Sequence, residues 1–176
     1  MENSIVLISK EYQELNKRLH DTRPTYGAGH ATSVYYKLVE DTYDEYNCSS
    51  LLEYGCGKGA LKQSLINLNV HEYDPCIEGK DSDPIACDML TCLDVMEHIE
   101  PDCLDNVLAH IKTKFNKVAF ITVSLIPAQA ILADGRNAHI LLKPVEWWLT
   151  RFKEDFEVIK HMVVEGHELV VLLGKS

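Results

Sequence analysis

The sequence lacks the features that mark several large classes of protein. No run approaches the ~20 apolar residues needed to cross a membrane, and the early apolar run from Ile5 to Ile8 is too short for a signal peptide. None of the six cysteines forms a Cys-x-x-Cys pair, so we expect reduced thiols that are buried as small apolar side chains. Repeats, low-complexity tracts and Gly/Ser linkers are also absent. These absences predict a cytoplasmic globular protein without membrane contact.

Basic residues are scarce. Seventeen Lys and Arg stand against 27 Asp and Glu, which gives a net charge of −10. Non-specific nucleic-acid binding needs a basic field, so this composition excludes it, although a specific nucleotide substrate stays open. The length of 176 residues predicts one domain at 28–176. A polar segment at 1–27, without clear periodicity, is expected to pack on that domain as an arm or lid.

Short apolar runs alternate with helical patterns along the rest of the chain. The pattern predicts strands at 51–54, 70–73, 89–93, 118–123, 156–164 and 168–173, with helices at 34–46, 60–68 and 103–115 and another beginning at Pro144. Such alternation is typical of a three-layer α/β fold with a mostly parallel sheet. The last two strands, joined across Glu165-Gly166-His167, predict an antiparallel hairpin at one edge.

A glycine-rich turn follows the first predicted strand. Gly55, Gly57 and Ala60 fit the looser dinucleotide fingerprint, and Asp74 follows nineteen residues after Gly55, where an acidic side chain can hold ribose hydroxyls. The glycines alone therefore do not distinguish between nucleotide cofactors.

Glu53, two residues before the first glycine, favours one of these cofactors. Its carboxylate would repel a pyrophosphate at the helix N-terminus, as NAD would place there. The same carboxylate suits S-adenosylmethionine, which carries an ammonium, a sulfonium and a ribose diol but no phosphate. Charge therefore favours S-adenosylmethionine over NAD.

Three motifs in this order resemble the class I S-adenosylmethionine-dependent methyltransferases, a Rossmann-like family. The motifs are Leu52-Glu53-Tyr54-Gly55-Cys56-Gly57-Lys58-Gly59, Tyr73-Asp74-Pro75 and Leu93-Asp94-Val95-Met96-Glu97-His98-Ile99. The resemblance covers roughly residues 26–174. It implies that Glu53, Tyr54, Gly55, Cys56 and Gly57 face the methionine part of the cofactor. It further implies that Asp74 and Pro75 lie at the ribose, that Leu93 and Asp94 lie beside the methyl donor, and that Tyr26 closes over it.

The segment between the second and third predicted strands departs from the family pattern. Only thirteen residues separate Asp74 from Asp88, where the family fits a helix, a strand and another helix. We therefore expect the sheet to lack the usual third strand, whose following loop flanks the adenine. Either 83–87 takes that role, or the adenine is bound more loosely. The missing strand would also leave a sheet edge that a second copy of the chain, in a homodimer, could cover.

Acidic and imidazole side chains gather near the next strand end. Asp94, Glu97 and His98 share one face of a helical turn. His139 follows the neighbouring strand, whose tip lies only ~5 Å away. These four side chains could ligate a divalent ion such as Mg²⁺, Mn²⁺ or Zn²⁺. Alternatively, Glu97 and His98 cap the next helix while the others are solvated.

A similar carboxylate-x-x-Glu-His group with a later His binds a divalent ion in small-RNA 2′-O-methyltransferases and ubiquinone-pathway O-methyltransferases. This chain has Asp94 where the RNA enzymes carry Glu, and the shorter side chain reaches less far. Eight acidic side chains and no Lys or Arg lie in 81–105, which disfavours a polyanionic acceptor unless a metal offsets the charge.

These observations predict transfer of a methyl group from S-adenosylmethionine to an oxygen of a small molecule or nucleotide end, with a nitrogen as the weaker alternative. A divalent metal, or His98 or His139 as general base, would free the nucleophile, with Glu97 at the same site. Two alternatives remain: a non-catalytic S-adenosylmethionine-binding module of the same fold, and an NAD-dependent oxidoreductase.

Overall fold

The computed structural model describes residues 5–176, so the first four residues of the predicted arm lie outside the described residues. Six strands form one sheet in the order β2-β1-β3-β4-β6-β5. The strands are β1 (Leu51–Tyr54), β2 (Val70–Tyr73), β3 (Cys87–Leu93), β4 (Phe115–Ser124), β5 (Phe156–Val164) and β6 (Glu168–Lys175). The first four are parallel, and β6 runs antiparallel to both β4 and β5. The predicted α/β fold with a C-terminal hairpin is confirmed.

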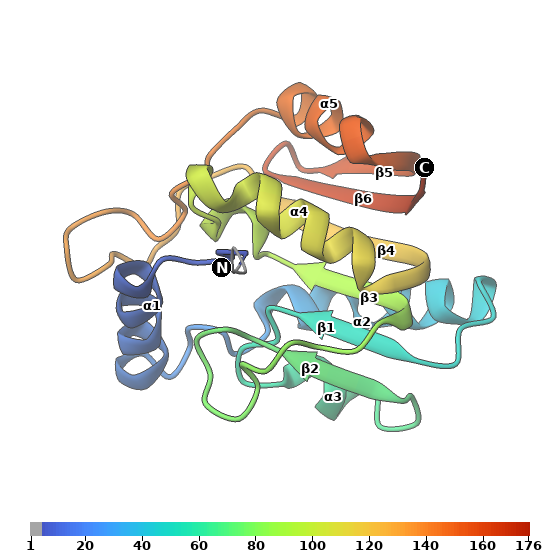
Figure 1. The fold of residues 1–176 in the computed structure, drawn as a ribbon, viewed down its shortest axis with the longest axis horizontal. Helices are drawn as coiled ribbons and strands as arrows, with labels where there is room; N and C mark the ends of the chain where they lie inside the picture. Colours follow the sequence, from blue (N-terminus) through green and yellow to red (C-terminus); the bar gives the residue numbers. More distant parts are fainter. Residues whose placement is uncertain (1–4) are drawn as a thin grey trace.

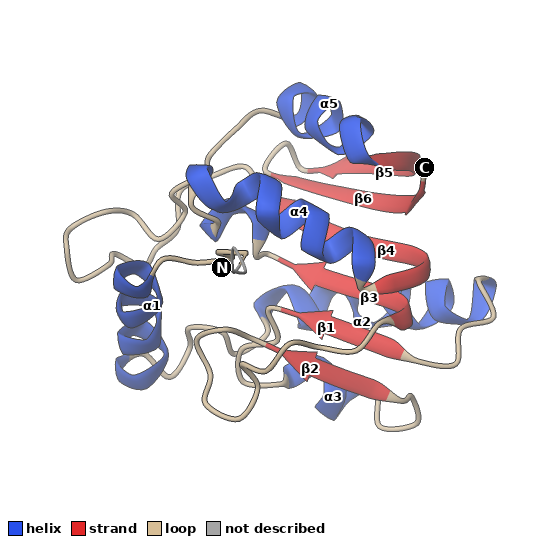
Figure 2. Ribbon diagram, viewed as in Figure 1, coloured by secondary structure: helices blue, strands red, loops and turns tan. Residues whose placement is uncertain are grey.

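Helices cover both faces of this sheet, as Figures 1 and 2 show. They are α1 (Lys10–Thr22), α2 (His30–Glu45), α3 (Ala60–Ser64), α4 (Leu104–Thr113) and α5 (Val145–Asp155), with 3-10 turns η1 (Met96–His98) and η2 (Pro101–Cys103). Leu108 of α4 and Trp148 of α5 belong to the apolar core on one face. Val39 of α2 and Leu61 of α3 belong to the core on the other. The three layers follow from these two cores.

The predicted absence of the usual third strand is also confirmed. Residues 74–86 connect β2 to β3 and form no strand, which leaves β2 at the edge of the sheet. No described helix is both long enough and apolar enough to span a membrane.

Several predicted boundaries shift. The helix expected at 60–68 ends at Ser64, and the one expected at 103–115 ends at Thr113 because Phe115 already pairs with Cys87 in the sheet. Pro144 precedes its helix as the N-cap instead of lying in the first turn.

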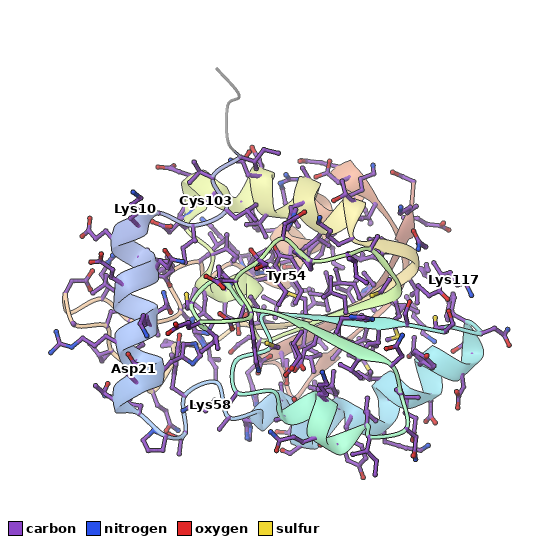
Figure 3. The ribbon with its side chains drawn as sticks, turned by 60° about the horizontal axis from the view of Figure 1, so that its bottom comes forward. Lys10, Asp21, Tyr54, Lys58, Cys103 and Lys117 are labelled. Atoms are coloured by element: carbon purple, nitrogen blue, oxygen red, sulfur yellow. The ribbon has the colours of Figure 1, made fainter. Side chains whose placement is uncertain are left out.

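The arm contains a helix that the sequence pattern did not predict. Helix α1 buries Tyr12, Asn16 and Leu19, which lie at helical spacing on one face. Because Asn16 is polar, the buried face does not show the apolar periodicity by which a helix is predicted from sequence. Ser9 caps the helix by accepting a hydrogen bond from the backbone N–H of Tyr12. Figure 3 shows α1, between Lys10 and Asp21, standing across one end of the sheet.

Candidate active site

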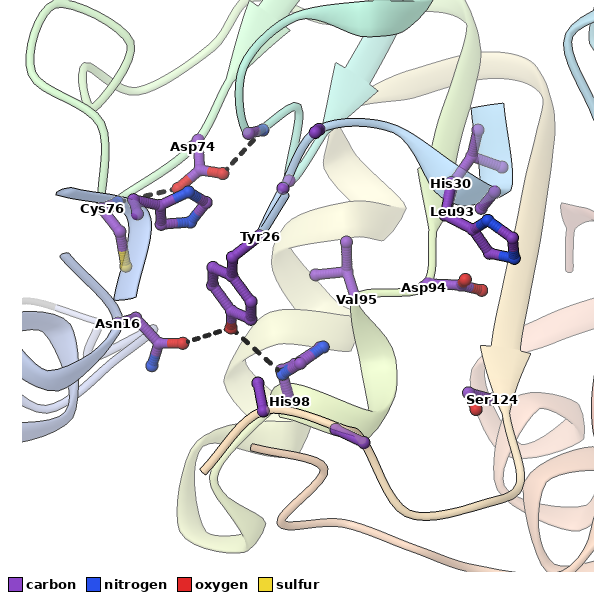
Figure 4. Close-up of a pocket in the computed structure, with 18 of the residues that line it drawn as sticks. Asn16, Tyr26, His30, Asp74, Cys76, Leu93, Asp94, Val95, His98 and Ser124 are labelled. Atoms are coloured by element: carbon purple, nitrogen blue, oxygen red, sulfur yellow. Dashed lines mark hydrogen bonds between the residues drawn. The ribbon is translucent and has the colours of Figure 1, made fainter. Parts of the chain in front are cut away.

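A cavity of about 640 Å³ opens at the carboxyl ends of the parallel strands. This is where open α/β sheets bind ligands. Of the predicted site residues, those lining it are Tyr26, Glu53, Gly55, Cys56, Gly57, Asp74, Pro75, Leu93, Asp94, His98 and His139. In Figure 4, Asp74 and Cys76 lie toward one end, His98 and Ser124 toward the other, and Tyr26 between them. The structure therefore brings most of the predicted residues to one site.

Two predicted residues, Tyr54 and Glu97, do not line the cavity. The Tyr54 side chain points to the opposite face from that of Glu53, because neighbours on a strand alternate. Its ring packs on Tyr73, and its hydroxyl lies 2.9 Å from Nδ1 of His110, within the core on that face. The side chain of Glu97 is fully buried, next to the cavity-lining His98 and His139. A cofactor in the cavity would therefore not meet the phenol of Tyr54.

The glycine turn is backbone that only glycine fits well. Gly57 has φ +50°, and a Cβ there would lie 2.6 Å from the carbonyl oxygen of Gly27 in the arm. The Gly57 N–H donates to Oδ2 of Asp74 (2.9 Å), and the Cys76 N–H donates to its Oδ1 (2.9 Å). These bonds fix the Asp74 carboxylate at the tip of β2, beside the turn.

Glu53 carries a carboxylate in an unusual environment. The residue is only 5% exposed, and its Oε2 is buried without a hydrogen-bond partner among the described residues. Burial, reinforced by the negative charge of Glu72, raises the pKa of Glu53 to about 8. An orphaned buried oxygen is costly unless a donor or cation reaches it. The site therefore has a place for a positively charged group of a ligand.

At the other end of the cavity, Glu97, His98 and His139 form one group. One potential ligand atom of each lies within 4.8 Å of those of the other two. Nδ1 of His139 lies 2.6 Å from the carbonyl oxygen of Ile126, which can only accept, so Nδ1 carries the proton. Nε2 is left with its lone pair and faces Oε1 of Glu97 at 3.8 Å. His139 is thus held as a ligand would be.

The other two members of the group suit a cation as well. Oε1 of Glu97 accepts from the Ser124 N–H (3.2 Å), while its Oε2 is buried without a partner among the described residues. Burial and the nearby Asp94 raise the pKa of Glu97 well above its ordinary value. Burial, with a smaller contribution from the neighbouring imidazole of His139, lowers the pKa of His98 to about 3, so the ring of His98 is neutral.

The structure does not bring Asp94, predicted as a fourth ligand, into this group. Its backbone has φ +53°, its N–H donates to Oγ1 of Thr122, and that hydroxyl donates to its Oδ1 (2.7 Å). Figure 4 shows the Asp94 carboxylate directed away from His98. The short side chain is therefore engaged by β4 and not by the imidazoles.

The sequence pattern missed the cavity residues of helix α1, which are Tyr12, Asn16 and His20. The loop after β4 adds residues 126–130 to the cavity wall. The spacing of Tyr12, Asn16 and His20, four residues apart, was the available signal. Asn16 also accepts a hydrogen bond from the hydroxyl of Tyr26 (2.8 Å), which itself lies 3.5 Å from Nδ1 of His98.

No protein-family model matches the chain, and no curated protein matches it. Solved structures do resemble it. One is a 1,6-didemethyltoxoflavin-N1-methyltransferase from Burkholderia thailandensis, bound to 1,6-didemethyltoxoflavin and S-adenosylhomocysteine. It is 18% identical with a TM-score of 0.66, covering 97% of this chain and 92% of that one.

Two further structures are similar. The N-methyltransferase NodS from Bradyrhizobium japonicum, in complex with S-adenosylhomocysteine, has a TM-score of 0.63 at 14% identity, over 95% of this chain and 99% of that one. The methyltransferase domain of a bacterial Hen1 has a TM-score of 0.57 at 12% identity, over 82% and 100%. At such identities the likeness shows the shared fold, the Rossmann-like fold of these methyltransferases.

Proposed function

We propose that the protein is an S-adenosylmethionine-dependent methyltransferase. The observation that carries the proposal is the Glu53 carboxylate, buried beside the glycine turn with one oxygen unpartnered. The ammonium or the sulfonium of S-adenosylmethionine would supply the positively charged partner that this oxygen lacks. Asp74, fixed at the tip of β2, would accept hydrogen bonds from the ribose hydroxyls. The similar structures that contain S-adenosylhomocysteine support the same reading.

The same residues disfavour NAD. A pyrophosphate needs backbone N–H donors free of nearby negative charge. Here one such donor, the Gly57 N–H, already bonds to the Asp74 carboxylate, and Glu53 lies on the same cavity wall. An NAD-dependent oxidoreductase is therefore the weaker alternative.

Methyl transfer asks the protein mainly for alignment and for exclusion of water. Leu93 and Asp94, at the end of β3, would lie beside the methyl donor. The arm and residues 126–130 wall the cavity above them, and Tyr26 lies between its two ends. In the reaction the methyl carbon leaves the sulfonium sulfur, which keeps the bonding electron pair. The methyl carbon would form its new bond to the acceptor atom, which would lose a proton.

We propose that Glu97, His98 and His139 hold a divalent metal ion when one is bound. A buried carboxylate with one unpartnered oxygen, one neutral imidazole and one imidazole with a free Nε2 fit such an ion. The ion would lower the pKa of an acceptor hydroxyl and thereby ease O-methylation. With its pKa near 3, His98 suits ligation better than proton abstraction near neutral pH.

The acceptor we propose is a small molecule or a single nucleotide end. The cavity must hold both the cofactor and the acceptor within about 640 Å³. Its wall after β4 is largely apolar, with Ile126, Pro127, Ala128 and Ala130. Among the described residues that line the cavity, Arg23 is the only Lys or Arg, so a polyanionic chain would find little compensating positive charge.

Titration calorimetry with S-adenosylmethionine, S-adenosylhomocysteine and NAD tests the proposal. We expect micromolar binding of the first two and weaker or no binding of NAD. Replacing Glu53→Gln should weaken the methyl-cycle ligands at least about 30-fold, because it removes one partner of a buried charge pair. The exposed Glu154→Gln serves as the matched control. Binding of NAD alone would contradict the proposal.

A non-catalytic binding module of the same fold is the second candidate. The shortened segment between β2 and β3 favours it, because it removes part of the usual scaffold. Transfer of a labelled methyl group to any of a panel of hydroxyl acceptors, with Mn²⁺ or Mg²⁺ present, would identify an enzyme. Tight cofactor binding without transfer would favour the module.

A further inference from the structure

The segment that replaces the usual third strand, residues 74–86, does not contribute to the site in the expected way. Residues 83–87 were expected to flank the adenine, yet none of them lines the cavity. The Asp83 carboxylate instead accepts from Nε2 of His110 (2.8 Å) and from Nζ of Lys114 (2.9 Å). Figure 1 shows the segment looping beyond the tip of β2 before it returns to β3. The part of the segment that reaches the site is its first half.

Lys80, in this first half, is held against the glycine turn by both its backbone and its side chain. Its carbonyl oxygen accepts from the Asp74 N–H (2.9 Å), so the segment turns back to the tip of β2. Its Nζ donates to the carbonyl oxygen of Gly57 (3.3 Å) and to Oε1 of Glu72 (2.9 Å). The turn approaches so closely that a Cβ at Gly59 would lie 3.1 Å from this Nζ. The ammonium of Lys80 therefore has a defined place beside the turn.

The carboxylate that Lys80 contacts is the neighbour of Glu53 in the sheet. Glu53 of β1 and Glu72 of β2 are paired in register, so their side chains leave the same face of the sheet from strands ~5 Å apart. Two carboxylates so close to each other disfavour the ionised form of both. Lys80 offsets one of these charges, and water screens the ion pair little, because the side chains of Lys80 and Glu72 are only 24% and 17% exposed.

Other charged groups act on the same pair of glutamates. Nζ of Lys62 lies 3.6 Å from Oε2 of Glu72, but the Lys62 side chain is 54% exposed, so water screens its charge. Burial raises the pKa of Glu53, as do Glu72 and, less strongly, Asp74, whereas the charge of Lys80 acts in the opposite direction. Lys80 does not line the cavity, so it would influence a ligand through Glu53 and not by contact.

We infer that Lys80 is a positioning residue of the methyl-donor site, where its ammonium neutralises Glu72 and thereby lets Glu53 meet the cationic end of the donor in ionised form. The inference rests on the proposed function and adds to it the group that prepares Glu53. Without Lys80, ionisation of Glu53 would place two uncompensated carboxylates side by side. The segment that lacks the third strand thus contributes a cation to the site.

The pH dependence of S-adenosylhomocysteine binding, measured by titration calorimetry, tests the inference. The ionised form of Glu53 attracts the ligand ammonium, so the wild-type affinity should rise with pH up to about 8. Lys80→Met keeps most of the length of the side chain and removes its charge. It should displace this rise to higher pH and weaken binding near pH 7 by about tenfold for each unit by which the pKa of Glu53 increases. The loss relative to the wild type should therefore shrink above about pH 8.

Further variants separate this electrostatic role from a merely structural one. Lys80→Arg keeps the charge and should bind almost as the wild type does. Adding Glu72→Gln to Lys80→Met restores the net charge beside Glu53, so the double variant should return the rise in affinity close to its wild-type pH. Lys62→Met is the matched control, and it should displace the rise much less than Lys80→Met does, because the Lys62 charge is screened by water.

Two outcomes would overturn the inference. One is an affinity that Lys80→Met leaves unchanged. The other is a loss that is equal at about pH 6 and about pH 9 and that Glu72→Gln does not relieve, because Lys80 would then only hold the turn in place. Thermal unfolding shows whether Lys80→Met keeps the fold. If it does not, Glu72→Gln alone decides, since it should move the rise in affinity to lower pH, and an unmoved rise would contradict the inference.

The proposed function fails separately. If the wild-type protein binds neither S-adenosylmethionine nor S-adenosylhomocysteine, the proposed function falls and the inference with it. If it binds both, and the pH dependence of binding does not respond to Lys80→Met, only the inference falls. In Glu53→Gln the affinity should be weaker and should no longer rise with pH below about 8, with or without Lys80→Met, because Lys80 acts through Glu53.

Discussion

The two ends of the cavity differ in how far apart in the chain their residues lie. At the ends of β1 and β2, Glu53, the glycine turn and Asp74 come from one strand–helix–strand unit of 24 residues. At the ends of β3 and β4, Glu97 lies close to His139, which follows β4 in the chain. His98 lies beside Tyr26, although the two residues are 72 positions apart in the sequence. The first end is fixed by local chain geometry, and the second by packing of a loop and the arm.

Both ends contain a buried glutamate with an unpartnered oxygen, but their neighbours differ. Glu53 lies beside the glycine turn, and its unpartnered oxygen is Oε2. Glu97 also has an unpartnered Oε2, but its Oε1 lies 3.8 Å from Nε2 of His139. The first environment suits an organic cation and the second a metal ion. The comparison teaches that two buried glutamates in one cavity can suit different ligands, because different neighbouring groups surround each carboxylate.

The largest expected effect is on metal binding, which we propose for the second end of the cavity and not for the first. His139→Ala and Glu97→Gln should each weaken Mn²⁺ by more than about 100-fold, because each removes a ligand and not merely a supporting contact. Asp94→Asn should leave the Mn²⁺ affinity nearly unchanged, since Asp94 lies outside the group. Calorimetric or paramagnetic titration measures this. A large loss with Asp94→Asn and none with His139→Ala would contradict the assignment.

Gly57→Ala should damage the first end. The φ of +50° and the 2.6 Å approach to the Gly27 carbonyl predict a loss of about 2–4 kcal/mol in the free energy of unfolding. Gly135→Ala is the control, because Gly135 has φ +90° and no described residue comes within 4 Å of a Cβ there, so only the backbone strain of about 1 kcal/mol remains. Denaturant unfolding measures the free energy of unfolding of both variants. Equal losses in the two variants would show that the close approach of Gly27 to Gly57 adds nothing to the backbone strain.

The pH dependence of stability sharpens the description of Glu53. Its pKa rises from an ordinary 4.5 to about 8 on folding, so the neutral form is favoured in the folded protein. The ligand-free protein should therefore lose stability as the pH rises from about 5 through 8, by at most about 1.4 kcal/mol per pH unit for one group. Thermal unfolding in a chelator should show a shallower decline for Glu53→Gln. An identical slope in both proteins would remove Glu53 as a cause.

The smallest expected effect concerns the arm. Ser9→Ala removes the N-cap of α1 and one bond to Glu100, which should cost about 1 kcal/mol. Amide hydrogen exchange should accelerate in α1 while the sheet remains protected. Ser33→Ala, whose hydroxyl is exposed on α2, is the control. Uniform acceleration throughout the protein would mean that the arm does not open on its own.

Local patterns predicted the first end of the cavity better than the second. The strands at 51–54 and 70–73 and the turn between them depend on neighbours in the sequence, and the structure places them with the predicted bounds. The side chain of Tyr54 was misplaced because the motif does not say which face of β1 each residue takes. Alternation along the strand would have separated it from Glu53.

Long-range packing explains what the sequence did not show. Asp94 was grouped with Glu97 and His98 by assuming a helical turn, but its backbone has φ +53° and the turn begins only at Met96. Helix α1 was missed because its buried face includes Asn16, whose partner Tyr26 is another arm residue. Neither fact follows from apolar periodicity.

Proton release on binding S-adenosylhomocysteine tests the central claim most directly. At pH 7 the Glu53 carboxyl, with its pKa raised to about 8, is mostly protonated in the free protein. An arriving ammonium would favour the ionised form. Calorimetry in two buffers of different ionisation enthalpy should therefore show close to one proton released per ligand by the wild type and none by Glu53→Gln. Tight binding by both proteins with no proton released would contradict the claim that Glu53 receives the cationic end of the methyl donor.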